Sequence, residues 1–193
     1  MTSYFRPALV LVAIFTVLTG LAYPLAMTGL ANLVFPSAAG GSLIVREGTI
    51  VGSRLIGQVF SSDRYFHGRP SAAGQAGYDA AASSGSNLGP LSKKLLDRVA
   101  ADVTGLRGPG GGSPVPADAV TTSASGLDPH ISAAYAELQV ERVAKARGVS
   151  PDRVRAIVAQ NLDRPDFGLI GEERINVVLL NLALDAAFAP ASG

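Results

Sequence analysis

The sequence of 193 residues contains no cysteine, and this absence removes several kinds of chemistry. Without thiols the chain can form no disulfide bond, no thiolate nucleophile and no cysteine-type zinc or iron–sulfur site. An excess of positive charge is also missing, because 16 lysines and arginines stand against 15 aspartates and glutamates that are scattered along the chain. A nucleic-acid binder needs a basic stripe, so we do not expect nucleic acid as a partner.

Charge is also missing near the N-terminus, where no charged residue lies between Arg6 and Arg46. The stretch 8–35 is almost entirely apolar. As a helix rising about 1.5 Å per residue it would reach roughly 42 Å, more than the roughly 30 Å of hydrocarbon in a bilayer. The sequence therefore predicts one transmembrane helix over residues 8–35, kinked at Pro24 and followed by an exit at Pro36.

A cleaved signal peptide is the alternative interpretation, since Arg6 and the apolar run also fit an n-region and an h-region. The run exceeds the h-region length of about 7–15 residues and lacks a small-x-small cleavage site after a polar stretch, which favours an anchor. Arg6 in the short tail 1–7 favours a cytoplasmic N-terminus. Residues 36–193 would then form a single extracytoplasmic domain.

The first part of this domain carries signals for a small sheet. Residues 43–45 (LIV) and 49–51 (TIV) are rich in β-branched side chains and flank Gly48, which can adopt the positive φ of a hairpin turn. A third strand is predicted over residues 55–60. Residues 71–90 are rich in alanine, glycine and serine, so they are expected to be irregular backbone.

The later part carries helical signals, chiefly proline or aspartate at the start of an apolar stripe and glycine at its end. The predicted elements are a helix from Pro90 to before Gly105, a loop over 106–116, a strand over 118–122, a helix from Asp128 to Gly148, a helix between Pro151 and Pro165, and a helix over 171–188. The last is too short to span a bilayer and is expected to be buried. The predicted class is α+β, with a small sheet early and helices late.

Several residues invite a catalytic or metal-binding interpretation. Asp128 and His130 could be a base and its orienting group, but no Gly-x-Ser-x-Gly elbow accompanies them, so Asp128 is favoured as a helix cap. His67 and His130 without a carboxylate pattern make a weak metal site. The glycine-rich stretch 108–114 lacks the lysine and hydroxyl residue that follow a phosphate-binding loop.

Two asparagines, Asn176 and Asn181, interrupt the apolar part of the last predicted helix. If buried, their side chains need hydrogen-bond partners. Hydrogen bonds within the core and contacts with another subunit are both consistent with the sequence.

Six strings of residues together resemble a known family, the C subunit of the potassium-transporting Kdp P-type ATPase. They are GSRLIGQ at 52–58, YFHGRPSA at 65–72, SGSNLGP at 84–90, DAVTTSASGLDPHIS at 118–132, ERVAKARG at 141–148 and GEERINVVLLNLAL at 171–184. They follow the family's order, and the single N-terminal span lies in its expected place. The glycine- and proline-rich loop at 106–116 is a departure.

The resemblance implies a pump in the bacterial cell (inner) membrane, in which a channel-like subunit carries potassium, a P-type ATPase subunit hydrolyses ATP and a small membrane peptide completes the assembly. This chain would be a non-catalytic accessory subunit needed for assembly. The resemblance also implies a chaperone-like role that raises the ATP affinity of the ATPase subunit. The complex would use ATP, magnesium and potassium, with no cofactor bound directly to this chain.

The strings also contain the residues expected to serve as interface or structural positions. They are Phe66, Arg69, Pro70, Asn87, Asp128, His130, Asn176 and Asn181. The alternative function is a free-standing, membrane-anchored binding or hydrolytic domain that uses His67, Asp128 and His130.

Overall fold

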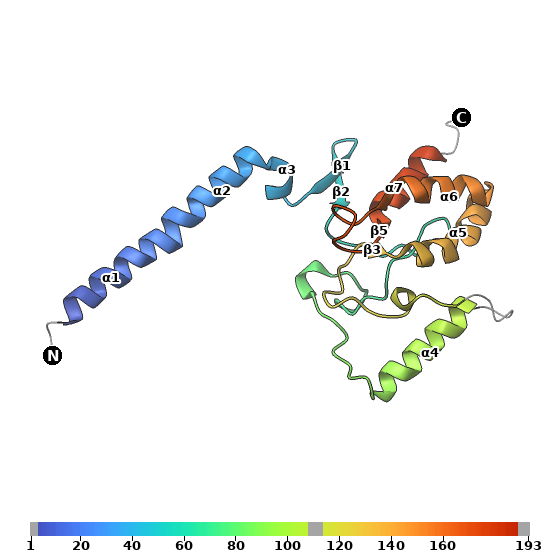
Figure 1. The fold of residues 1–193 in the computed structure, drawn as a ribbon, viewed down its shortest axis with the longest axis horizontal. Coiled ribbons are helices and arrows are strands. Elements are labelled where there is room, and N and C mark those ends of the chain that lie inside the picture. Colours follow the sequence, from blue (N-terminus) through green and yellow to red (C-terminus); the bar gives the residue numbers. More distant parts are fainter. Residues whose placement is uncertain (1–3, 108–113, 189–193) are drawn as a thin grey trace. The chain divides into compact units, whose positions relative to one another are not determined.

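One long apolar helix dominates the first of the two units into which the chain divides, Met1–Val51 and Gly52–Gly193. The structure is a computed structural model that describes residues 4–107 and 114–188 (Figure 1). The helix consists of α1 (Phe5–Val17), a π-helical turn η2 (Leu18–Ala22) and α2 (Tyr23–Val34). It is 30 residues long and contains an 18-residue stretch with a mean hydropathy of 2.2, so the helix is long and apolar enough to cross a membrane.

The π-helical turn lies immediately before Pro24. The backbone N–H of Tyr23 donates to the carbonyl of Leu18, five residues earlier, and Thr19 Oγ1 donates to the Phe15 carbonyl at 2.7 Å. A wider turn gives the proline ring room against the preceding carbonyls. The disturbance predicted at Pro24 therefore takes the form of a π turn.

A β-hairpin follows the long helix and the short helix α3 (Pro36–Ala39). Its strands are β1 (Leu43–Arg46) and β2 (Thr49–Ser53), as the sequence predicted. Glu47 and Gly48 at the turn both have positive φ, 50° and 78°, the conformation that the tightest hairpin turns require.

The third strand predicted over residues 55–60 is wrong. Only one isolated bridge, between Ser53 and Ile56, forms there. Gly57 instead donates its backbone N–H to the carbonyl of Leu127 at 2.8 Å, which ties this segment to a distant loop.

The second unit is built from a short antiparallel sheet and three packed helices (Figure 1). The sheet has the order β3 (His130–Ile131), β5 (Arg174–Asn176), β4 (Leu162–Asp163), and the helices are α5 (Ala133–Arg147), α6 (Pro151–Gln160) and α7 (Val177–Ala187). Ile175 of the central strand pairs with Ile131 on one side and Leu162 on the other.

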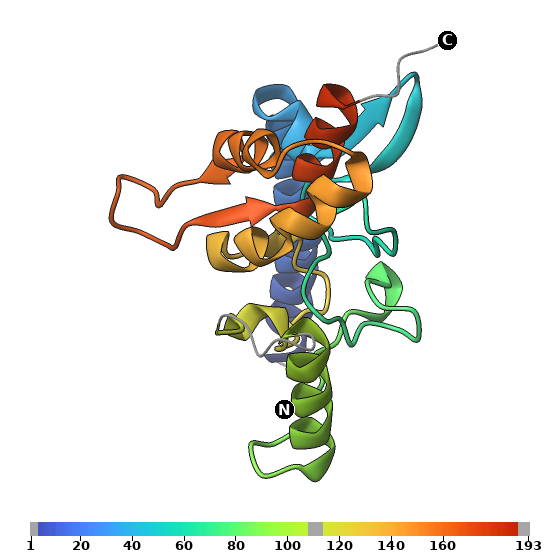
Figure 2. The same ribbon diagram turned by 90° about the vertical axis from the view of Figure 1, so that its right-hand side faces the viewer.

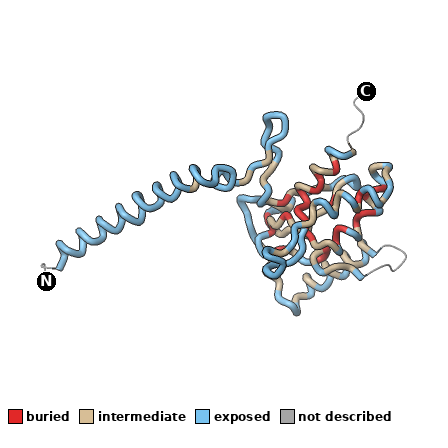
Figure 3. The backbone as a smooth tube through the Cα atoms, turned by 45° about the horizontal axis from the view of Figure 1, so that its top comes forward, coloured by how far each residue is buried: buried red, intermediate tan, exposed pale blue. Residues whose placement is uncertain are grey.

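Buried apolar side chains of the sheet and helices form one core. Its fully or almost fully buried members include Phe66, Ile131, Val140, Val143, Val154, Ile175, Leu180 and Leu184. Figure 3 shows the buried residues gathered in the helices of the second unit, whereas the N-terminal helix is exposed along its length. The prediction that the last helix is buried is confirmed, because Leu180 and Leu184 are completely covered.

Several predicted boundaries are wrong because strands replace predicted helical residues. Asp128 does not cap a helix: residues 130–131 are a strand, and Ser132 caps α5 by accepting a hydrogen bond from Tyr135 N at 3.0 Å. The last helix begins at Val177 rather than at residue 171, because residues 174–176 form β5. The strands therefore do not all lie early in the chain, although the α+β class holds.

Two further predictions fail between β2 and β3. The helix predicted from Pro90 is α4 (Lys93–Arg107), which starts later, continues past Gly105 and leaves Leu91 and Leu96 exposed. The strand predicted over 118–122 is instead a 3-10 turn, η5 (Ala117–Ala119). The loop predicted over 106–116 begins inside α4, and its residues 108–113 lie outside the described residues.

The start and end signals of the two middle helices are confirmed. Gly148 ends α5 in the left-handed conformation, with φ 68°, where glycine has no Cβ to clash. Pro151 is the first residue of α6, where its missing N–H costs no hydrogen bond.

Amide side chains from the helices hold the irregular segment that contains Phe66. Asn181 Oδ1 accepts from Phe66 N at 2.8 Å while its Nδ2 donates to Phe66 O at 2.9 Å. Gln139 does the same for His67, accepting from its N–H at 2.7 Å and donating to its carbonyl at 3.1 Å. Each side-chain amide replaces the partner that a neighbouring strand would supply. We call these two pairs the amide clamp.

A partly buried ion pair strengthens the same attachment. The side chain of Arg147 is fully buried and lies 2.9 Å from Asp185 Oδ1, and its Nε donates to Arg64 O at 2.7 Å. Tyr65 donates its hydroxyl to Asp185 Oδ2 at 3.0 Å and lies under the Arg147 guanidinium. Helices α5 and α7 and the segment before Phe66 are thereby joined through charged hydrogen bonds.

The amide clamp makes a stability prediction. Asn181→Ala leaves the buried N–H and carbonyl of Phe66 unpaired, so we expect a loss of roughly 2–4 kcal/mol in the free energy of unfolding. Urea unfolding of the full chain in detergent, followed by tyrosine fluorescence, measures it. The control is Asn161→Ala, at the residue after α6, which removes only a side-chain hydrogen bond to Ile157 O of that helix. Equal losses in the two variants would contradict the clamp.

Candidate functional site

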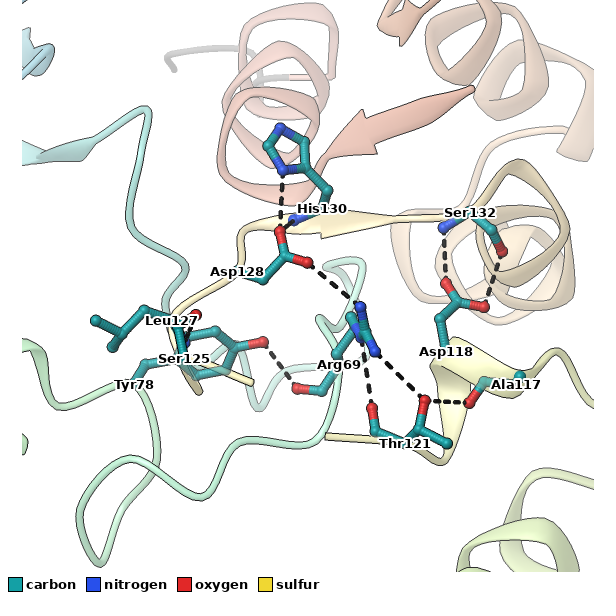
Figure 4. Close-up of polar contacts among 10 residues, drawn as sticks. All are labelled: Arg69, Tyr78, Ala117, Asp118, Thr121, Ser125, Leu127, Asp128, His130 and Ser132. Atoms are coloured by element: carbon teal, nitrogen blue, oxygen red, sulfur yellow. Dashed lines mark hydrogen bonds and ion pairs between the residues drawn. The ribbon is translucent and has the colours of Figure 1, made fainter. Parts of the chain in front are cut away.

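A polar cluster forms where the segment after the amide clamp meets the strand β3 (Figure 4). Arg69 Nη1 lies 3.3 Å from Asp128 Oδ2, while its Nε and Nη2 donate to the carbonyl and hydroxyl of Thr121 at 3.4 and 3.3 Å. His130 places its backbone N and its Nδ1 each 3.0 Å from Asp128 Oδ1. Arg69, Thr121, Asp128 and His130 are the polar cluster.

Glycine and serine residues fix the backbone that carries Arg69. Ser71 Oγ donates to the carbonyl of Gly126 at 2.6 Å and accepts from the backbone N–H of Tyr78 at 2.8 Å. Tyr78 in turn donates its hydroxyl to the Arg69 carbonyl at 2.8 Å. Gly126 has φ 68°, and a side chain there would meet the backbone of Ala73. The loop before β3 and the segment after Arg69 are thus held together.

The electrostatics of the polar cluster favour a charged Asp128. Burial alone would raise the pKa of its carboxyl, but the hydrogen bonds and charge of His130 and the charge of Arg69 outweigh burial and lower the pKa below its ordinary value. Burial, helped by the Asp128 charge, raises the pKa of Tyr78 to about 12, so its hydroxyl remains a donor. The arrangement suits a fixed ion pair.

An open pocket of about 590 Å³ lies beside the polar cluster. Arg69, Asp128 and His130 line it together with Asp118 and the Glu172–Arg174 segment. The Asp118 carboxylate already has two hydrogen-bond donors within the chain, Ser132 N at 2.7 Å and Ser132 Oγ at 2.9 Å.

The hydroxyl groups of the site donate to oxygen atoms close by. Thr121 Oγ1 donates to the Ala117 carbonyl at 2.8 Å, and Ser132 Oγ donates to Asp118. Neither hydroxyl donates to His130, the base that the sequence offered. Within residues 4–107 and 114–188, no group of three or more metal-ligating side chains comes together.

The structure brings together three of the residues that the sequence singled out, Arg69, Asp128 and His130. His67 lies elsewhere: its Nε2 is 3.3 Å from the Ser62 carbonyl, and burial and the Arg142 charge lower its pKa. The predicted cap at Asp128 is replaced by a turn in which its carboxylate accepts from His130 N.

The other predicted positions have structural places. Phe66 is fully buried and Asn181 binds its backbone, so the core alternative holds for Asn181. Asn176 caps α7 by accepting from Leu179 N at 3.2 Å and donates to the Arg54 carbonyl at 2.8 Å. Pro70 is half-buried, whereas Asn87 is exposed, with φ 51°.

Sequence reasoning missed Gln139, Thr121 and Tyr78. Gln139 could have been found from the sequence, because it is a polar residue on the same helical face as Tyr135 and Val143, which are buried. Thr121 and Tyr78 lie in stretches without periodicity, so only the three-dimensional structure reveals their contacts.

Comparisons with known proteins agree along the whole chain. The family model described as "KdpC: K+-transporting ATPase, c chain" matches residues 5–186. A "Potassium-transporting ATPase KdpC subunit" of Caulobacter vibrioides is 57% identical over 191 residues, covering 98% of this chain and 96% of the relative. Proteins with the same name are 56% identical in Methylobacterium nodulans, covering 96% and 98%, and 54% identical in Rhodopseudomonas palustris, covering 97% and 100%.

The lowered pKa of Asp128 predicts acid sensitivity. Because the pKa of Asp128 is lower in the folded state than in the unfolded state, the charged carboxylate stabilises the fold fully at neutral pH. This stabilisation is lost as the pH falls through the folded-state pKa. Asp128→Asn should cost about 1 kcal/mol at neutral pH, allowing for the partial exposure of the pair, and nothing in acid. Urea unfolding at several pH values measures this. The control is Asp97→Asn, in the exposed pair with Lys93. A difference that persists in acid would contradict the role of the ion pair.

Proposed function

The chain belongs to the KdpC family, the c chains of K+-transporting ATPases, and from this premise we propose that it is a non-catalytic accessory subunit of an ATP-driven potassium uptake pump. The observation that carries the proposal is that the polar side chains of the cluster and of Ser132 bind to other groups of the same site. Arg69 and His130 both bind Asp128, and the hydroxyls of Thr121 and Ser132 donate to a backbone carbonyl and to Asp118. These contacts support a scaffolding role for the cluster.

We propose that the subunit is a single-pass protein of the bacterial cell (inner) membrane. The 30-residue helix supports this, and Arg6 supports a cytoplasmic tail over residues 1–7, with residues 36–193 outside the cytoplasm. One helix cannot by itself enclose a pore, so potassium would pass through another subunit. Small residues along the helix, among them Gly20, Ala22 and Ala26, offer a surface for close helix packing.

The partners in this proposal are a channel-like subunit that carries potassium, a P-type ATPase subunit and a small membrane peptide. The proposed chaperone-like effect raises the ATP affinity of the ATPase subunit. With the folded domain outside the cytoplasm, that effect is an allosteric coupling transmitted through the packed membrane helices rather than a direct contact with ATP.

The proposed orientation can be tested with single cysteines, because the natural chain has none. Leu91→Cys and Tyr4→Cys place exposed thiols on the two sides of the span. A membrane-impermeant maleimide should label Leu91→Cys in intact spheroplasts and Tyr4→Cys only after lysis. Labelling in the opposite order would overturn the orientation.

The accessory role predicts different results for deletion and for loss of the histidines. Deleting the gene should abolish ATP-driven potassium uptake and leave the remaining subunits poorly assembled. His67→Ala combined with His130→Ala should leave uptake largely intact, because neither ring performs chemistry in this proposal. Uptake and subunit co-purification are the measurements. Normal potassium-dependent ATPase activity without the chain, or its loss in the double variant with assembly intact, would refute the accessory role.

A further inference from the structure

The connection between β4 and β5 carries large apolar side chains at its tip. Phe167 is 94% exposed, Leu169 89% and Ile170 65%. Figure 2 shows this connection, drawn in orange, extending away from the helices of the second unit. In the part of the chain that the structure describes, nothing covers these side chains. We call residues 166–170 the hairpin tip.

The hairpin tip is ordered by its own backbone. Asp166 and Ile170 exchange backbone hydrogen bonds at 2.9 and 3.0 Å, and Leu169 N donates to Asp166 O at 3.1 Å. Phe167 has φ 55°, a conformation that bulky residues rarely adopt. Because the backbone of this loop is already ordered, the loop loses little further backbone conformational entropy when its aromatic ring binds a partner.

The composition of the tip is that of an anchor for another protein. Aromatic side chains that enter a pocket supply much of the binding free energy of protein interfaces. A Phe beside two aliphatic residues, held away from the core, gains nothing from folding of the second unit, so its exposure is unfavourable until a partner covers it.

The charges around the tip distinguish between possible partners. The tip and the strands and turns next to it carry four carboxylates and two arginines, all exposed: Asp163, Arg164, Asp166, Glu172, Glu173 and Arg174. This acidic border is repelled by the negative surface of an anionic bilayer. It complements a protein surface with basic side chains around an apolar cleft.

On the basis of the proposed role as a pump subunit, we propose that the hairpin tip inserts into an apolar cleft, bordered by basic side chains, on another subunit of the same pump. Phe167 and Leu169 fill the cleft, and Glu172 and Glu173 pair with its border. The tip thus supplies a contact separate from that of the membrane helix.

Photo-crosslinking in the assembled pump tests this contact. Benzoylphenylalanine replaces Phe167 in the full chain, and the control carries it in place of Leu91, which is also 94% exposed but lies before α4. We expect an adduct with another pump subunit from position 167 and none from position 91. An adduct with phospholipid or with a second copy of this chain, or no adduct in an assembled pump, would overturn the proposal.

A second measurement concerns the residence time of the subunit in the detergent-solubilised pump. Phe167→Ser combined with Leu169→Ser should raise its dissociation rate about tenfold, and Glu172→Lys with Glu173→Lys should also raise it. Leu91→Ser should not. Unchanged rates in the tip variants would refute the inserted tip. If the unaltered chain failed to co-purify with any pump subunit, the proposed function itself would fall instead.

Discussion

The second unit depends on how the long, irregular backbone segment that contains Phe66 and His67 satisfies its hydrogen bonds. This segment forms almost no helix or sheet. Buried peptide groups need partners, and a segment without a neighbouring strand must find them elsewhere. Asn181 and Gln139 meet this requirement for Phe66 and His67, each accepting from one N–H and donating to one carbonyl. The side chain of Phe66 can therefore be fully buried in the core without leaving its own backbone unpaired.

The polar cluster is a consequence of this attachment. Arg69 follows His67 by two residues, so fixing the clamp brings its guanidinium to the loop that ends at β3. Asp128 lies between Arg69 and His130 because the register of β3 against β5 sets His130 opposite Asn176, and Asn176 in turn caps α7. The amide clamp, the three-stranded sheet and the polar cluster are thus connected to one another around β5.

Features that depend on neighbouring residues were predictable from the sequence. The hairpin around Gly48, the end of α5 at Gly148 and the start of α6 at Pro151 each follow from local backbone preferences. The strands β3, β4 and β5, of two or three residues each, leave no periodic pattern, and tertiary pairing overrode the helix start expected at Asp128. The sequence could point to Arg69 and Asp128, but not to their pairing across 59 positions.

The amide clamp also has a consequence for when the second unit can fold during synthesis. Asn181 lies 115 positions beyond Phe66, so the ribosome must add 115 residues after Phe66 before the two can meet. Until then the peptide groups of Phe66 lack their Asn181 partner, and the core lacks its last helix. Contacts between residues so distant along a chain slow folding, because the entropy cost of closing a large loop must be met before the contact can form. The second unit can therefore complete its core only after residue 181 has been synthesised.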